Sequence, residues 1–324
     1  MSNDDISTTA NGSSPSVQVS RKAQGSWTDV FALPRPLREL FSKFPLITYA
    51  ANELPSRSPR HQYKHALYIF ATPEGAKNNE LSYNPTCLKW QTYLKLRGID
   101  FVPMASNNHA SPSGSLPFLL PAPTQSQNSK TSSSPPIPAS KIRRWADDQL
   151  PSSPAQSSMK EDIYLSLLDH RLRRAWLHQL YLTPANLPLL THLYCHASLS
   201  PLITHSTLIS LRAAASDEIS KSSPIASVSE STLQEEGCAA LDALDELLGK
   251  DEWFFGAKEP GVFDAAVFAY THLLLEEELG GGQGEGEGQG WGWNGLGGHL
   301  KGKRGLVGHR RRVWRRAFGG RRRG

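Results

Sequence analysis

Residues 253–275, WFFGAKEPGVFDAAVFAYTHLLL, decide the fold of this chain. Apolar residues recur at i, i+3, i+4 and i+7 from Phe263 to Leu274, which predicts one stripe of a buried helix. Asp264 falls in the first turn, where its carboxylate can accept free backbone N–H groups at the positive helix end. Gly261 stands at the expected N-cap, and Gly256 belongs to the preceding turn. The stretch is typical of the central helix of an all-helical domain.

The charge of the chain is unevenly distributed. Its 324 residues carry 35 Lys and Arg and 30 Asp and Glu, a formal charge of +5. Residues 301–324 hold eleven of these basic residues and no acidic one, which leaves 24 basic against 30 acidic residues before them, a net charge of −6. The basicity belongs to a tail, and an acidic body without a recognition motif predicts no nucleic-acid partner.

Cysteine and histidine spacing predicts neither a disulfide framework nor a metal site. The N-terminal residues MSNDDISTTANGSSPS lack an apolar core, so we expect no secretory signal. No run reaches the ~18 apolar residues of a membrane span, so any membrane attachment is expected to be peripheral. The cysteines and histidines whose spacing fits neither a disulfide framework nor a metal site are Cys87, Cys195, Cys238, His170, His178, His192, His196 and His205.

The first half of the chain alternates strands and helices. After a polar segment, 1–33, predicted to be disordered, residues 34–150 are predicted to form an α/β domain interrupted by a Ser/Pro-rich insert at 122–136. Asn84 and Pro85 are predicted to be the N-cap and the first residue of a helix that ends at Gly98. Pro117, early in a strand, is explained by a cis Leu116–Pro117 bond. The elements expected are a helix from Pro36, an extended segment at 44–49, strands at 65–70, 99–104 and 115–121, and a helix over 137–150.

The second half, residues 159–279, is predicted to be helical. Helices are expected at 160–182, 201–219 and 231–249, followed by the organising helix; the third opens with a capping box, Ser231-x-x-Gln234. Residues 280–324 are predicted to be a Gly-rich linker and a basic tail. The tail is either solvated and mobile or in contact with an anionic membrane surface. The residues predicted for that contact are Arg310, Arg311, Arg312, Trp314, Arg315 and Arg316.

Four segments carry a resemblance to a known fold. They are YNPTCLKWQTYLKLRGIDF (83–101), SGSLPFLLP (113–121), YLSLLDHRLRRAWLHQLYL (164–182) and WFFGAKEPGVFDAAVFAY (253–270). Their order is similar to the α+β glutathione-transferase-like fold, a thioredoxin-like N-terminal domain followed by an all-helical domain. More specifically, the chain resembles the metaxin family, and PRPLRELFSKFPLITY (34–49) is most like the smaller fungal metaxin-like subunit. The Gly/Glu/Gln run after Leu279 departs from the family's last helix, of which GLVGHRRRVWRRA (305–317) is the candidate remnant.

The resemblance implies a non-enzymatic subunit of the mitochondrial sorting and assembly machinery (SAM complex). It would lie peripherally on the cytosolic face of the outer membrane. Its partners would be a β-barrel insertase subunit, a second metaxin-like subunit and β-barrel precursors, whose C-terminal β-signal it would help to recognise. An extended precursor strand could pair with an exposed edge of the sheet, as in β-augmentation.

An enzyme of the same fold is the alternative, either a glutathione-dependent transferase or a reductase. It would need a thiol-stabilising group among Ser82, Tyr83 and Cys87, but Cys87 lies inside the predicted helix and Asn84 cannot supply that chemistry. Ser140 could hold the γ-glutamyl group of glutathione, although an ordinary N-cap is preferred. We therefore expect no catalytic residue, cofactor or metal. The third hypothesis is a transferase-like interaction module, such as those attached to translation factors.

Overall fold

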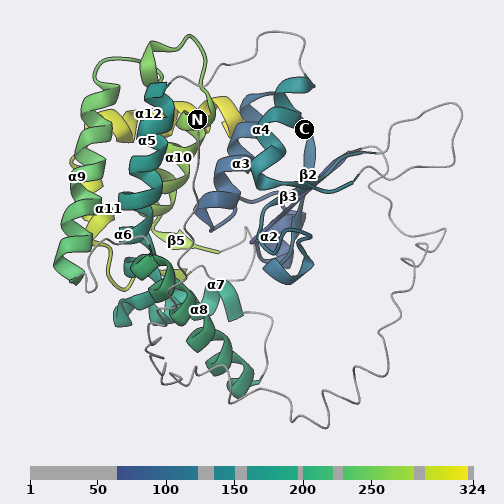
Figure 1. Cartoon of the computed structure of the whole chain (residues 1–324), viewed down its shortest axis with the longest axis vertical. Coiled ribbons are helices and arrows are strands. Elements are labelled where there is room, and N and C mark those ends of the chain that lie inside the picture. Colours follow the sequence, from purple (N-terminus) through teal and green to yellow (C-terminus); the bar gives the residue numbers. More distant parts are fainter. Residues whose placement is uncertain are drawn as a thin grey trace, which may run out of the picture. The chain divides into compact units, whose positions relative to one another are not determined.

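A computed structural model describes residues 64–122, 135–149, 159–195, 200–221, 229–280 and 289–319. The predicted disordered segment 1–33, the elements expected at 34–49 and most of the predicted insert lie outside these residues. Figure 1 shows a small sheet with its helices on one side of the described part and a set of longer helices on the other. The predicted α+β fold, a thioredoxin-like half followed by a helical half, is confirmed.

The sheet has the strand order β2-β1-β3-β4. β1 pairs with β2 in parallel and with β3 antiparallel, and β3 pairs antiparallel with β4. The peptide bond before Pro117, just ahead of β3, is cis. Buried side chains of β1, α3 and α4 form one apolar core. The elements are β1 (His65–Ile69), α2 (Pro73–Lys77), α3 (Pro85–Leu96), β2 (Phe101–Ala105), η2 (Asn108–Ala110), β3 (Phe118–Leu120), β4 (Ile137–Pro138) and α4 (Ala139–Asp148).

Both edges of the sheet are poor templates for an added strand. At the β2 edge, the N–H of Ser106 donates to the C=O of Ile69 at 3.0 Å. Because alternate residues of a parallel strand bond toward the neighbouring strand, the backbone groups of Phe101, Pro103 and Ala105 face outward. Pro103 has no N–H to donate, and β4 is two residues long and ends in a proline. A precursor strand added at either edge would therefore meet few outward backbone N–H donors.

The helical half begins with four consecutive segments that correspond to the helix predicted at 160–182. The four segments are α5 (Met159–Leu167), η3 (Leu168–Leu172), α6 (Arg173–Leu177) and η4 (His178–Leu182). Of these, η3 and η4 are π-helical. The short η5 (Pro184–Asn186) and α7 (Leu187–Cys195) follow, and α7 was not predicted. Then come α8 (Pro201–Lys221), α9 (Glu230–Leu248), η6 (Phe254–Gly256) and α10 (Val262–Leu275). The predicted capping box of α9 is wrong, because Ser229 caps this helix through its Oγ, which accepts from the N–H of Thr232 at 3.2 Å.

The organising helix, α10, is buried along its length except for Leu275. Its first residues also reach the core of the sheet domain, where Val262 and Ala265 are buried. Figure 1 shows α10 between α9 and α3. A mostly apolar helix is stable in this position because it is covered on every side.

The prediction of a linker and tail over 280–324 is wrong for residues 289–319, whereas the candidate helix remnant at 305–317 is confirmed as part of α12. This part forms β6 (Gln289–Gly290), which pairs with β5 (Glu278–Leu279), and the helices α11 (Gly295–Lys301) and α12 (Arg304–Phe318). Its glycines permit close packing: a Cβ added to Gly297 would lie 2.5 Å from the carbonyl oxygen of Leu274. Four apolar residues of α11 and α12 are fully buried in the helical core: Leu296, Leu300, Leu306 and Val313.

Candidate functional site

The three side chains that were candidates for stabilising a thiol in the alternative, enzymatic hypothesis point into the protein core. Ser82 is fully buried, and its hydroxyl donates to the carbonyl of Phe70 at 2.6 Å. Tyr83 is buried and packs edge-on against Tyr194, with ring centroids 5.3 Å apart. Cys87 is fully buried, and burial raises the pKa of its thiol to about 12. Reactive thiols are exposed and have lowered pKa values, so Cys87 is inert at neutral pH.

The N-terminus of α3 is closed by side chains from both halves of the protein. Asn84 is its N-cap, and its Oδ1 accepts from the N–H groups of Thr86 and Cys87 at 3.0 and 3.3 Å. Its Nδ2 donates to the hydroxyl of Tyr194 in α7 at 3.4 Å, and that hydroxyl accepts from Tyr181 at 2.7 Å. Burial raises the pKa of both tyrosines, which therefore stay neutral. The position beside the helix end is thus filled by a neutral hydroxyl.

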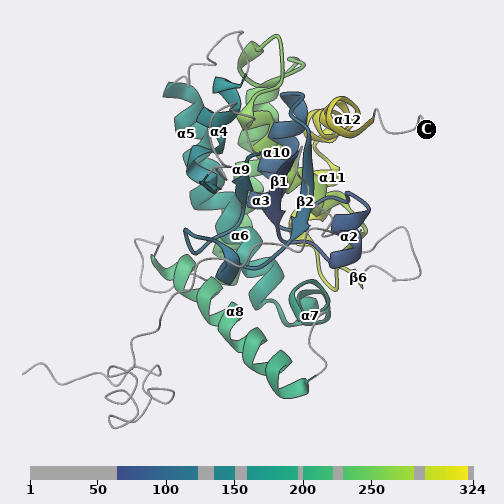
Figure 2. The same ribbon diagram turned by 90° about the vertical axis from the view of Figure 1, so that its right-hand side faces the viewer.

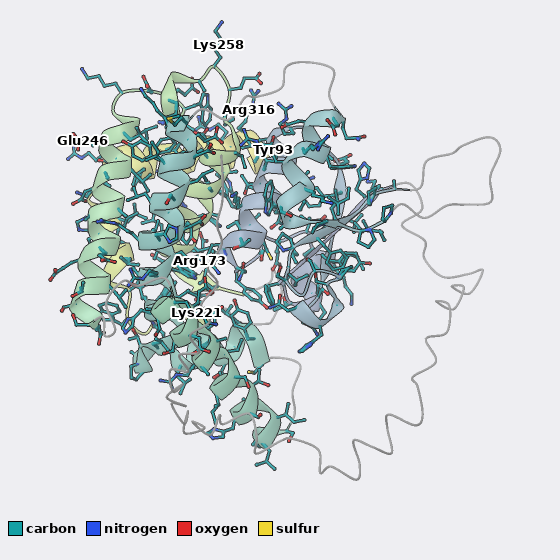
Figure 3. The ribbon with its side chains drawn as sticks, in the orientation of Figure 1. Tyr93, Arg173, Lys221, Glu246, Lys258 and Arg316 are labelled. Atoms are coloured by element: carbon teal, nitrogen blue, oxygen red, sulfur yellow. The ribbon has the colours of Figure 1, made fainter. Side chains whose placement is uncertain are left out.

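A cavity of about 520 Å³ lies beside this closed helix end. Arg173 lies between the helical half and α3, as Figure 3 shows. Its Nε is 2.5 Å from the carboxylate of Glu218, and its Nη1 donates to the hydroxyl of Thr86 at 3.3 Å. Burial lowers the pKa of Lys89, another lining residue. The lining residues are Pro85, Thr86, Lys89, Ser115, Leu116, Ala139, Leu165, Leu168, Asp169, His170, Arg173, Arg174, Glu218, Ala266 and Tyr270.

This cavity has the size of a small-molecule site, and its walls combine apolar side chains with several charged ones. None of Ser82, Tyr83, Cys87 and Ser140 is among the lining residues that the structure describes. The arrangement could hold a small ligand by charge, but it places no thiol-stabilising group against that ligand.

Two further predictions concern the ends of elements. Ser140 is not an N-cap: α4 begins at Ala139, Pro138 occupies the cap position, and Ser140 is exposed without a capping bond. The chain passes directly from β4 into α4, so the helix begins before the serine. Gly256 adopts φ +65°, a left-handed conformation that favours glycine.

Asp264 joins three parts of the helical half. Its Oδ2 accepts from the N–H of Gly261, the N-cap, at 2.8 Å. Its Oδ1 accepts from the N–H of Phe254 at 3.1 Å and lies 2.9 Å from Nε2 of His309 in α12. His309 is fully buried against the rings of Trp253 and Phe254. Sequence reasoning missed His309, although its spacing with Leu306 and Val313 was the signal of a buried helix face.

The arginines predicted to contact a membrane divide into two sets. Arg310 lies 2.6 Å from the carboxylate of Glu276. Arg312 donates to backbone carbonyls before η6, and Arg316 lies 3.7 Å from Glu259. These three side chains therefore have partners within the protein. The remaining predicted residues are exposed: Arg311, Trp314 and Arg315.

Within the described part of the chain, no group of three or more His, Cys, Asp or Glu side chains is arranged to hold a metal ion. None of the helices described is both long and apolar enough to cross a membrane.

Two models of known protein families match this chain. A family model described as the glutathione S-transferase N-terminal domain matches residues 85–186, and one described as the glutathione S-transferase C-terminal domain matches residues 237–313. No curated protein sequence matches the chain.

Several solved structures are similar to this chain at low identity. Glutathione S-transferase III in its apo form is 14% identical, with 78% of this chain and 91% of that chain covered and a TM-score of 0.41. The beta-etherase LigF from Sphingobium sp. strain SYK-6 is 14% identical, with 78% and 95% covered and a TM-score of 0.45. Glutaredoxin 2 from Salmonella typhimurium, in complex with glutathione, is 14% identical, with 79% and 95% covered and a TM-score of 0.42.

The two family models, which match the two halves in sequence order, agree with the observed arrangement of a thioredoxin-like sheet followed by helices. The chain therefore belongs to the glutathione-transferase-like superfamily.

Proposed function

We propose that the chain is a non-enzymatic, metaxin-like subunit of the mitochondrial sorting and assembly machinery. In this role it lies peripherally on the cytosolic face of the outer membrane, receives β-barrel precursors and aids their insertion. The observation that carries the proposal is the closed N-terminus of α3. A glutathione-dependent enzyme needs an open thiol-stabilising group there, whereas Asn84 caps the helix and Tyr194 fills the adjacent position.

An exposed apolar surface supports the role of a subunit. Leu202, Ile203 and Ile209, in the N-terminal half of α8, are 82%, 59% and 55% exposed. Figures 1 and 2 show this half of α8 extending beyond the neighbouring helices. Leu202 and Ile209 are seven residues apart and therefore lie on the same face of the helix. Exposed apolar groups of this kind are typical of protein-protein contacts, so we assign this face to the barrel subunit.

Recognition of the precursor is assigned to side chains rather than to strand pairing. An added strand at β2 would meet outward N–H groups at Phe101 and Ala105 but none at Pro103 between them. Main-chain hydrogen bonds, which provide the affinity of β-augmentation, would be interrupted there.

The proposal is tested by affinity purification of the tagged full chain from its own cells in mild detergent. We expect an outer-membrane β-barrel insertase and a second metaxin-like protein to be recovered. The variant Leu202→Ser/Ile209→Ser should lose the barrel subunit. The matched control is Met159→Ser/Ile163→Ser, which removes two exposed apolar side chains from α5 and should retain it. Recovery of the wild-type chain without these partners, in a cytosolic fraction, would favour the interaction module instead.

The cavity favours a second candidate, a glutathione-dependent transferase or reductase. Its volume of about 520 Å³ and the amino group of Lys89 in its lining would suit a small anionic peptide. Calorimetric titration of the purified chain with glutathione distinguishes the two functions. We expect no heat of binding. Binding that is lost in Lys89→Ala, accompanied by turnover of a model substrate, would overturn the non-enzymatic assignment.

A further inference from the structure

One face of α12 carries arginines that point away from the protein. Arg304, Arg311 and Arg315 are spaced at i, i+7 and i+11, which places them within a narrow stripe of an α-helix. All three are exposed. Leu306 and Val313, on the opposite side of the helix, are fully buried. We call Arg304, Arg311 and Arg315 the arginine stripe.

The charge of the arginine stripe is not neutralised by the described part of the protein. The neighbouring Arg310 and Arg316 face Glu276 and Glu259, and Arg312 reaches backbone carbonyls. In contrast, no described carboxylate lies within 4.0 Å of a stripe guanidinium, and no hydrogen bond from the stripe to a described residue is present. The helix itself contains no acidic residue. The stripe is therefore available to an external anion.

An aromatic side chain borders the stripe. Trp314 is 43% exposed, and its inner surface stacks on His272, with ring centroids 5.1 Å apart. Trp is favoured where an apolar environment meets a polar one, as at a membrane surface. Figure 2 shows α12 at the margin of the described part, viewed nearly along its axis, with no other helix or strand outside it. A flat surface can thus approach the whole stripe.

We propose that the arginine stripe of α12 binds the anionic headgroups of a phospholipid membrane. The stripe extends over ~16 Å of helix, so a plane of phosphates can meet its three guanidinium groups at once. Arginine pairs well with phosphate because its planar group donates two parallel hydrogen bonds. Trp314 beside the stripe favours a lipid interface over RNA, which would require several stacking side chains. The inference does not depend on the proposed protein partners, because the binding involves this chain and lipid alone.

The test is flotation of the purified full chain with vesicles of phosphatidylcholine, with and without ~30% phosphatidylserine. We expect binding to the anionic vesicles and not to the neutral ones, and binding should weaken as salt is raised. Each basic group near an anionic surface contributes about fivefold in affinity, so Arg304→Gln/Arg311→Gln/Arg315→Gln should lower the partition coefficient about 100-fold.

Two matched variants make the result specific. Lys141→Gln/Arg144→Gln/Lys221→Gln removes the same charge from exposed positions on α4 and α8 and should change binding only a few-fold. Replacing all three stripe arginines with lysine keeps the charge and should retain most of the binding, which separates a loss of charge from a loss of fold. Equal binding to neutral vesicles, unchanged binding of the glutamine variant, or tighter binding to single-stranded RNA at the same salt would each overturn the proposal. Failure to bind vesicles would leave the affinity-purification result unaffected.

Discussion

Replacing Asp264 with alanine would remove the central acceptor at the start of α10. The carboxylate is 2% exposed and accepts from the N–H groups of Gly261 and Phe254, while His309 lies 2.9 Å away. Asp264→Ala leaves these buried groups without a partner, at about 1–3 kcal/mol for each unsatisfied group. Allowing for relaxation and for water entry, we expect a loss of about 4 kcal/mol from a total stability of ~5–15 kcal/mol. Asp264→Asn keeps one acceptor and should cost about half as much.

Urea unfolding followed by far-UV circular dichroism and tryptophan fluorescence would measure this loss. The fluorescence probe includes Trp253, whose ring lies 6.1 Å from that of His309. Asp217→Ala, at an exposed position in α8, is the matched control and should have little effect. If the free energy of unfolding of Asp264→Ala lies within about 1 kcal/mol of that of this control, the three contacts do not hold α10 and α12 together and the reasoning is refuted.

Four further predictions concern packing, reactivity and pH. Gly237→Ala should destabilise the protein by about 2 kcal/mol, because the new Cβ would lie 2.5 Å from a side chain of the facing helix. Gly298→Ala, which meets nothing within 4 Å, should stabilise α11 by about 0.5–1 kcal/mol in the same urea assay. Maleimide labelling of the native protein should leave Cys87 unmodified while the partly exposed Cys238 reacts, and early labelling of Cys87 would contradict its burial. Burial lowers the pKa of His272 from 6.5 to about 3, so its contribution to stability is complete above about pH 6.5 and is lost as the pH falls. Wild-type protein should lose about 2 kcal/mol more than His272→Gln between pH 7 and pH 5, and equal losses would contradict a buried neutral histidine.

Local signals were sufficient to predict the two helices that connect the halves. Asn84 followed by Pro85 defines the start of α3, and Gly98, with φ +70°, follows its end. The periodic apolar residues and Asp264 define α10. These signals are local because caps and amphipathic stripes involve residues within a few positions of one another.

The candidate site could be predicted only in part. Asparagine at position 84 already argued against thiol chemistry, and its capping role follows from its position before a proline. The hydroxyl of Tyr194, which completes the closure, comes from α7, 110 residues further along the chain, and α7 itself was not predicted. No spacing rule relates two residues that meet only through tertiary packing.

The sequence by itself determined the alternation of strands and helices in the first half, the caps of α3, the central helix and the resemblance that led to the superfamily. Tertiary structure decided what the glycine-rich and arginine-rich C-terminal region does. Its composition predicted a linker and a basic tail, and only the resemblance offered 305–317 as a helix, but Leu306, His309 and Val313 are buried against residues that lie far away in the sequence. A helix in a protein gains most of its stability from the surface that covers its apolar face, and composition does not reveal whether such a surface exists. The same packing separates the arginines that have partners within the protein from the stripe that faces outward.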